Sequence, residues 1–137
     1  GAIIVSTPQN IALADARKGA AMFQMDSINV PVLGIVENMS YFVPEELPNN
    51  KYYIFGKEGA GILADELKLP LLAEIPLVQS VREASDVGRP AVLQGSTPSA
   101  TIFLDFADRV VKEMKKRNQY EDTKRVEITN TNGCSTN

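Results

Sequence analysis

Histidine and tryptophan are absent from the 137 residues, and cysteine occurs once. A single cysteine excludes a disulfide within the chain. Without histidine, the common zinc spacings and the histidine-based catalytic triads are excluded as well. One thiolate is also too few for a self-contained four-thiolate iron–sulfur cluster.

Long apolar runs are also absent, so no segment could span a bilayer. The first residues lack the basic, apolar and small-residue pattern of a secretion signal, and we expect a cytoplasmic chain. The formal net charge of −3 argues against nucleic acid as the main partner. With 44% hydrophobic residues, the chain has enough material for one globular domain with a buried core.

Short apolar runs alternate with stretches of helical periodicity along the chain. Strands buried on both faces are expected at residues 2–5, 30–36 and 71–75. Helices are expected over residues 11–27, 56–67, 80–86 and 97–117. This alternation predicts an α/β fold, in which helices flank a parallel sheet and the crossovers are right-handed.

The boundaries of these elements follow from local signals. The second strand is expected to end in the segment 37–40, and residues 41–53 to form a surface loop that could close as a hairpin on residues 52–55. Pro76 is expected to stop the third strand. Gly88 is expected to end a short helix, and Thr97 to cap the last helix, with Pro98 in its first turn.

The expected organisation is a folded portion over residues 1–117 and a polar, disordered tail over residues 118–137. Three strands make a thin sheet. At least one outer strand is therefore expected to need a neighbour that this chain does not contain. The folded portion is thus expected to be a fragment of a larger domain.

Four sequence blocks occur in a characteristic order. They are Ser-Thr-Pro-Gln at 6–9, Ala-Leu-Ala-Asp-Ala-Arg-Lys-Gly at 12–19, Gly-Ile-Val-Glu-Asn-Met-Ser at 34–40, and Glu-Ile-Pro-Leu with Val-Arg-Glu-Ala-Ser-Asp at 74–86. Together they resemble the Mrp family, MinD-like P-loop ATPases that serve as iron–sulfur cluster carriers. The resemblance covers residues 1–117 and implies half of a MinD-like P-loop NTPase domain.

In that family the phosphate-binding loop and the magnesium-binding aspartates lie upstream of the matched region. No glycine-rich loop followed by Lys-Ser/Thr occurs in this chain. The resemblance therefore implies a parent that binds and hydrolyses ATP with Mg²⁺, and a separate chain that is inactive. It also implies a homodimer that delivers clusters to apo iron–sulfur acceptor proteins.

The resemblance assigns an adenine-binding role to Asn38, whose amide offers both a donor and an acceptor. The loop formed by Ile75, Pro76, Leu77 and Val78 resembles the backbone segment that packs on the adenine face. Both lie where open α/β sheets bind ligands, at the carboxyl ends of strands. The alternative is that Asn38 is a turn residue that caps Met39 and Ser40. No catalytic residue and no metal ligand are predicted in this chain.

The family usually carries a Cys-x-x-Cys after the Asn-Met-Ser block, and these thiolates hold a bridging cluster. Here residues 41–48 contain no cysteine, and Glu45 and Glu46 cannot replace thiolates on a conventional cluster. Cys134 lies in the polar tail and is interpreted as incidental. The alternative, a cluster shared through Cys134 of two chains, supplies too few thiolates.

Two further features have structural interpretations. The segment 56–61 contains three glycines before a helix, but it fits neither Gly-x-Gly-x-x-Gly nor the Walker pattern, which favours close helix-to-sheet packing. Met22 and Met25 are interpreted as core fillers.

Charged side chains on two predicted helices also invite functional interpretations. Arg82 and Asp86 are expected to form a solvated pair rather than a catalytic one. Asp15 and Arg17 could face a dimer partner in the intact protein.

Two alternative functions remain open. The parent could be a MinD-like regulatory or partitioning ATPase that carries no cluster, which the missing Cys-x-x-Cys favours. The chain could instead be a non-catalytic half-domain that self-associates through an open sheet edge.

Overall fold

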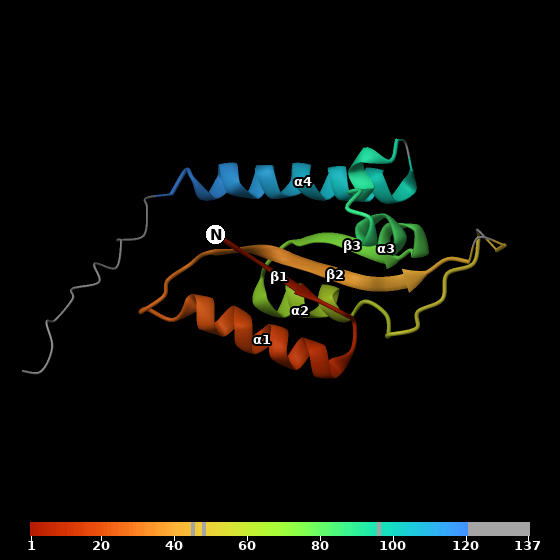
Figure 1. Cartoon of the computed structure of the whole chain (residues 1–137). Helices are drawn as coiled ribbons and strands as arrows, with labels where there is room; N and C mark the ends of the chain where they lie inside the picture. The colour runs from red at the N-terminus through yellow and green to blue at the C-terminus, as the bar shows by residue number, and fades with distance from the viewer. Residues whose placement is uncertain (45, 48, 96, 121–137) are drawn as a thin grey trace, which may run out of the picture.

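The computed structural model describes residues 1–44, 46–47, 49–95 and 97–120. Figure 1 shows its elements. They are β1 (Ala2–Ser6), α1 (Asn10–Gln24), β2 (Val32–Phe42), α2 (Gly59–Leu67), β3 (Leu71–Leu77), α3 (Gln79–Asp86), the 3₁₀-helix η1 (Ala91–Leu93) and α4 (Pro98–Arg117). Glu45, Cys134 and the predicted disordered tail from residue 121 onward lie outside the described residues.

The three strands form one parallel sheet in the order β1-β2-β3. Helices α1 and α2 lie on one face of the sheet, and α4 lies along the other (Figure 1). This arrangement confirms the predicted α/β fold with flanking helices. No helix in the described part of the chain is long and apolar enough to cross a bilayer.

The core has two parts, one on each face of the sheet. Ile35 of β2 packs with Leu63 of α2 in the first part, and Val36 of β2 packs with Leu72 of β3 and against Phe106 of α4 in the second. Neighbouring residues of β2 point to opposite faces, so one strand serves both parts.

A glycine in β2 allows β2 and β3 to approach closely. A Cβ on Gly34 would lie 2.6 Å from Leu72 Cγ and 2.7 Å from the Pro70 carbonyl oxygen. No larger residue fits at this point without moving β3.

The interpretation of Met22 and Met25 as core fillers is wrong. Their exposed fractions are 45% and 54%, and Ile11 is 76% exposed. The buried side of α1 is formed by Leu13, Ala16, Ala20 and Phe23, which pack in the first core. The prediction chose the wrong apolar stripe because α1 has apolar residues around much of its circumference, and the helix ends at Gln24 rather than at residue 27.

The expected strand ends are also corrected. β2 does not end in the segment 37–40 but continues to Phe42, because Phe42 still pairs with Leu77 of β3. β3 includes Pro76, which an outer strand tolerates because its unpaired side needs no N–H donor. The loop after β2 is closed by one antiparallel bridge between Phe42 and Tyr52, whose backbone N–H groups each donate to the other's carbonyl.

The predicted start of one helix differs from the structure, and the predicted start of another agrees with it. The predicted start of α2 at Gly56 is wrong, because Glu58 has a left-handed backbone (φ 59°) and the helix begins at Gly59. The predicted cap of α4 is confirmed, since the Thr97 hydroxyl oxygen accepts a hydrogen bond from the Ala100 N–H at 3.1 Å.

Candidate functional site

The carboxyl ends of β2 and β3 bring the predicted adenine-binding residues to the same end of the sheet. Asn38 lies opposite Ile75 in the register of the two strands. Asn38 is half-buried, and its Oδ1 accepts a hydrogen bond from the Met39 backbone N–H at 3.0 Å. This hydrogen bond supports the alternative interpretation of Asn38 as a turn residue that caps Met39.

β2 is irregular directly after Asn38. Met39 has a left-handed backbone (φ 57°), and the register with β3 shifts between Asn38 and Phe42. The Ser40 hydroxyl is buried and donates to the Glu37 carbonyl oxygen at 3.0 Å, which closes the irregular segment from the other side. The structure thus places a fixed bulge at the residue on which the predicted site depends.

The remaining predicted residues surround this point without sharing one cavity. Ile75 and Pro76 face the start of α4, where they lie near Ser99, Ile102 and Phe103. Leu77 pairs with Phe42. Val78 precedes α3 and lines a cavity of about 420 Å³ with Phe42, Pro44 and Gln79, among others. The backbone of residues 75–78 therefore forms one border of the carboxyl end, with Asn38 beside it.

Sequence reasoning missed the structural role of Glu37, which lies directly before Asn38. Its side chain is 1% exposed, and its Oε2 accepts a hydrogen bond from the Ala60 N–H at 2.7 Å. Ala60 is in the first turn of α2, whose dipole favours a negative charge at that point. The sequence signal for this structural role is a single carboxylate at the end of an apolar strand.

The three-glycine segment before α2 packs closely, as expected, but against a different element. A Cβ on Gly59 would overlap the Pro8 carbonyl oxygen in the β1–α1 loop and lie 2.8 Å from Leu13 Cδ1. The glycine allows α2 to approach this loop. Together with Glu37, it fixes the start of α2 relative to β1 and β2.

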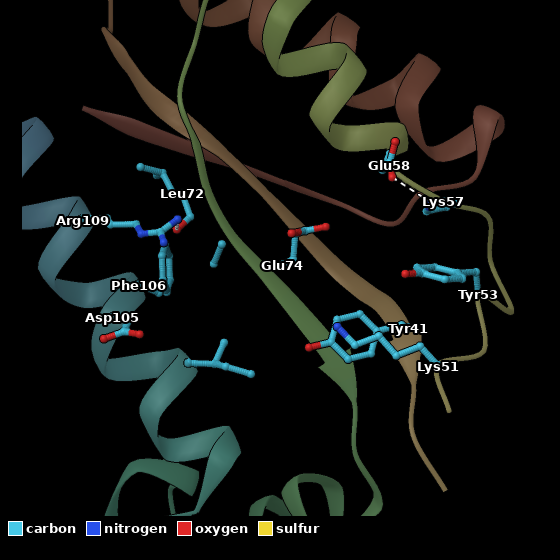
Figure 2. Close-up of a pocket in the computed structure, with 12 residues that line it drawn as sticks. Tyr41, Lys51, Tyr53, Lys57, Glu58, Leu72, Glu74, Asp105, Phe106 and Arg109 are labelled. Atoms are coloured by element: carbon cyan, nitrogen blue, oxygen red, sulfur yellow. Dashed lines mark hydrogen bonds and ion pairs between the residues drawn. The ribbon is translucent and has the colours of Figure 1, made fainter. Parts of the chain in front are cut away.

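A groove of about 430 Å³ runs beside β3 between α4 and the segment before α2 (Figure 2). On one wall, Lys51 lies 4.2 Å from the centre of the Tyr41 ring, and Lys57 lies 5.5 Å from that of Tyr53. The carboxylate of Glu58, 3.1 Å from the Lys57 Nζ, raises the pKa of that lysine above its usual value.

The opposite wall of the groove comes from α4. Arg109 Nη1 donates to the Leu72 carbonyl oxygen at 3.3 Å, while Asp105 lies beside it in the groove (Figure 2). The groove therefore presents charges of both signs, and its chemistry does not select one class of ligand.

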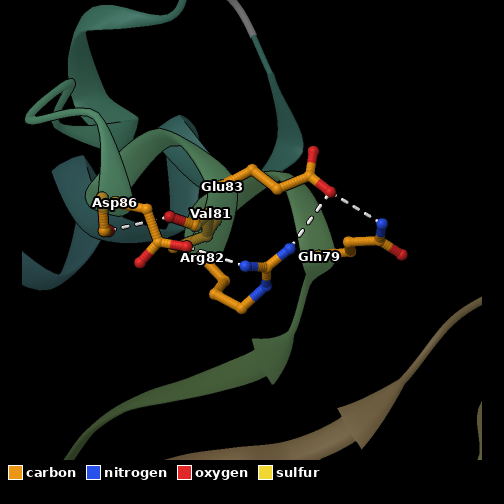
Figure 3. A network of polar contacts seen from close by, with 6 residues as sticks. Gln79, Val81, Arg82, Glu83 and Asp86 are labelled. Carbon is orange, nitrogen blue, oxygen red and sulfur yellow. Dashed lines mark hydrogen bonds and ion pairs between the residues drawn. The ribbon is translucent and has the colours of Figure 1, made fainter.

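The polar residues of α3 form an exposed network (Figure 3). Arg82 contacts Asp86 at 2.7 Å and Glu83 at 3.2 Å, and the Gln79 amide donates to Glu83 at 2.7 Å. All three charged side chains are more than half exposed. This confirms the interpretation of Arg82 and Asp86 as a solvated pair.

Asp15 and Arg17, considered as possible contacts to a partner subunit, have partners within the chain. Arg17 Nη2 lies 2.6 Å from Glu66 Oε2 of α2, and Asp15 contacts Lys18 at 3.3 Å. The ion pair of Arg17 joins α1 to α2, whereas that of Asp15 lies within α1 and is exposed.

The described residues do not fit an iron–sulfur cluster. They include no cysteine, and no group of three or more His, Cys, Asp or Glu side chains among them could hold a metal ion. Thiolates are the usual ligands of such clusters.

Comparison with known proteins gives the family. Residues 1–111 match the ParA family profile described as NUBPL iron-transfer P-loop NTPase. The mouse iron-sulfur cluster transfer protein NUBPL is 50% identical over 116 residues, which are 84% of this chain and 35% of the mouse protein. The chain thus spans about a third of the length of this relative.

Solved structures agree on the fold. A nucleotide-binding protein from Archaeoglobus fulgidus in complex with ADP is 36% identical, with a TM-score of 0.59 over 72% of this chain and 38% of that one. The cell division ATPase MinD of Pyrococcus furiosus, at 24% identity, has a TM-score of 0.58 over 82% of this chain and 43% of that one. The chain belongs to the NUBPL-type iron-transfer P-loop NTPases of the ParA family.

Proposed function

We propose that this chain is the carboxyl-terminal part of a longer P-loop NTPase that binds and hydrolyses Mg·ATP and takes part in iron–sulfur cluster transfer. The family match and the name of the mouse relative support the transfer role. The ADP complex of the Archaeoglobus relative supports nucleotide binding. The phosphate loop and the magnesium ligands belong to the rest of the longer protein, so the separate chain is inactive.

The base of the nucleotide is proposed to bind at Asn38 and residues 75–78. The observation that carries this proposal is the pairing of Asn38 with Ile75 at the carboxyl end of the sheet. Adenine needs a polar edge contact and a surface on which its ring can pack. Asn38 supplies the first, and the backbone of Ile75, Pro76, Leu77 and Val78 supplies the second.

The proposed assembly is a cytoplasmic homodimer that transfers clusters to apo acceptor proteins. Cluster binding at the usual loop is not part of the proposal, because residues 41–48 contain no cysteine. If a cluster is carried, its thiolates must come from elsewhere in the longer protein or from another protein.

The absence of cysteine from residues 41–48 also favours a second candidate function, a regulatory ATPase that positions partner proteins and carries no cluster. Anaerobic reconstitution of the longer protein with iron and sulfide separates the two. A visible absorption band that passes to an apo acceptor supports the carrier, and a colourless protein supports the regulator.

Calorimetric titration of Mg·ADP into the longer protein tests the base site. Asn38→Ala is expected to weaken ADP binding by about tenfold, because a hydrogen-bonding amide is lost. Asn50→Ala is the matched control, since Asn50 is exposed in the loop before Tyr52. Equal affinities of the wild type and the Asn38→Ala variant would contradict the proposed site.

A further inference from the structure

We propose that Arg109 closes the free edge of the sheet: its guanidinium binds the backbone carbonyl of Leu72 in β3 and keeps a strand of a second copy of this chain from pairing there. Within the described residues, β3 pairs with β2 alone, and the free edge is its other side. An outer strand with unpaired backbone groups is a template for association with another chain. This role of Arg109 does not depend on nucleotide binding.

β3 contains a bulge at the point where Arg109 reaches it. The pairing of the two strands advances by one residue in β2 but by two in β3, from Leu71 to Ala73. Leu72 and Ala73 are consecutive, yet both are buried in the part of the core under α4, as is typical of a bulge. The extra residue leaves the ladder locally unpaired, and the Leu72 carbonyl accepts from Arg109 Nη1 at 3.3 Å (Figure 2).

The next residues show which backbone groups remain at the free edge. A parallel pair is bonded through the N–H and carbonyl of only one of its two residues. In the pair of Asn38 with Ile75 that residue is Ile75, because the alternative would need an N–H from Pro76. The backbone N–H and carbonyl of Glu74 therefore point away from β2, to the free edge.

The free edge thus has several features that oppose pairing with another strand. Glu74 carries an exposed charge, Pro76 supplies no N–H, and the bulge at Leu72 interrupts the regular spacing of the backbone groups. Outer strands that stay unpaired use these same features. Arg109 adds a further one, since it covers the outward carbonyl that precedes Glu74.

Arg109 is the feature of this edge that can be changed without altering β3. It projects from α4 and lies beside Asp105 in the groove along β3 (Figure 2). Its guanidinium gives the Leu72 carbonyl the donor that a neighbouring strand would otherwise give through a backbone N–H. A strand can pair at this point only after the guanidinium has left the carbonyl.

The opposite end of the sheet explains why this closure matters. β1 also has no second neighbour within the described residues, and its Val5 is 59% exposed. If β3 of one copy paired with β1 of the next, the contact would repeat from copy to copy without closing. Arg109 therefore prevents open-ended growth of the sheet at β3.

Sedimentation equilibrium of this chain tests the role with Arg109→Ala and the matched control Lys112→Ala. Both changes remove one positive charge from α4, but Lys112 makes no hydrogen bond or ion pair within the described residues. At equal concentration, Arg109→Ala should have an average mass about twofold or more above that of the wild type, and Lys112→Ala should match the wild type. Equal masses of Arg109→Ala and the wild type, or equal increases in both variants, overturn the proposal.

Arg109→Ala combined with Glu74→Pro locates the contact. Proline at position 74 removes an N–H that points to the free edge and leaves the bonds to β2 in place, which an outer strand tolerates. The combined variant should return to the mass of the wild type. If it associates as Arg109→Ala does, the contact lies elsewhere and the proposal is overturned.

A second pair of variants covers the case in which Arg109→Ala fails to fold. Arg109→Met keeps a long side chain on α4 but cannot donate a hydrogen bond, and Lys112→Met is its control. The same increase in mass is expected for Arg109→Met alone. Its absence overturns the proposal in the same way.

Discussion

Two neighbouring residues at the end of β2 have opposite surroundings and different tasks. Glu37 is buried and accepts a hydrogen bond from the first turn of α2, whereas Asn38 is half-buried beside β3. A buried carboxylate keeps its place only when it is hydrogen-bonded. Glu37 therefore has a structural role, and Asn38 is the residue that we propose for ligand contact.

The role of Glu37 gives a stability prediction. Glu37→Ala leaves the Ala60 N–H without its partner and opens a cavity, so it should lower the free energy of unfolding by about 2–4 kcal/mol. Glu74→Ala is the matched control, because Glu74 lies opposite Glu37 on β3 but is exposed, and a change within about 0.5 kcal/mol is expected. Urea unfolding measures both, and equal losses would contradict the assigned role.

Two glycines predict stability changes of opposite sign. Gly59→Ala should lower the free energy of unfolding by about 1–3 kcal/mol, because its Cβ would overlap the Pro8 carbonyl oxygen. Gly19→Ala should raise it by about 0.5–1 kcal/mol, because Gly19 lies inside α1 with no atom near the new Cβ. Thermal unfolding of both variants tests this, and a stabilised Gly59→Ala would show that α2 can move away from the loop.

At the scale of single residues, the sequence alone was informative where a signal was local. Thr97 is recognisable as a cap because its partner Ala100 is only three residues away. The burial of Glu37 could not be predicted, because its partner Ala60 is 23 residues away. Asn38 emerged from the family resemblance, and the bulge at Met39 had no sequence signal, since methionine is not typical of a left-handed backbone.

The elements themselves were largely predictable, and their ends less so. Alternating apolar and helical patterns located all three strands of the described sheet, because a strand buried on both faces has an unbroken apolar run. β2 was predicted too short because its last residues, Glu37–Phe42, are mostly polar or aromatic and pair through the backbone. The apolar face of α1 was misplaced, because Met22 and Met25 have apolar side chains like those of a core but are exposed.

The start of α4 gives a prediction at the scale of an element. Thr97→Ala should lower the free energy of unfolding by about 1 kcal/mol, because the Ala100 N–H loses its acceptor. Thr97→Ser keeps the hydroxyl and should restore most of the loss. Urea unfolding of the two variants distinguishes a cap from a packing effect of the methyl group, for which serine and alanine would be equally destabilised.

At the scale of the whole molecule, the sheet is thin and its outer strands carry exposed apolar side chains. β1 pairs only with β2 in the described part of the chain, and Val5 of β1 is 59% exposed although it lies in an apolar run. Ile11, at the start of α1, is 76% exposed. These features fit a chain that spans about a third of its mouse relative.

The exposed side of β1 predicts a difference between this chain and the longer protein. If the rest of the domain covers β1, Val5→Lys should destabilise the longer protein by about 1–3 kcal/mol, because a charge is then buried. The same change should leave the separate chain folded and reduce its self-association in sedimentation. Val87→Lys is the matched control, because Val87 is 68% exposed beyond α3. Equal tolerance of the two changes in the longer protein would show that β1 stays uncovered.

We propose that an adenine nucleotide binds between Asn38 and the end of β3. The most direct measurement is an amide ¹⁵N spectrum of the longer protein with and without Mg·ADP. We predict that outside the phosphate loop the largest shifts fall on the Asn38 side-chain NH₂ and on the backbone amides of Ile75, Leu77 and Val78, which lie together at the carboxyl end of the sheet. Binding of Mg·ADP that leaves these signals in place would contradict the account.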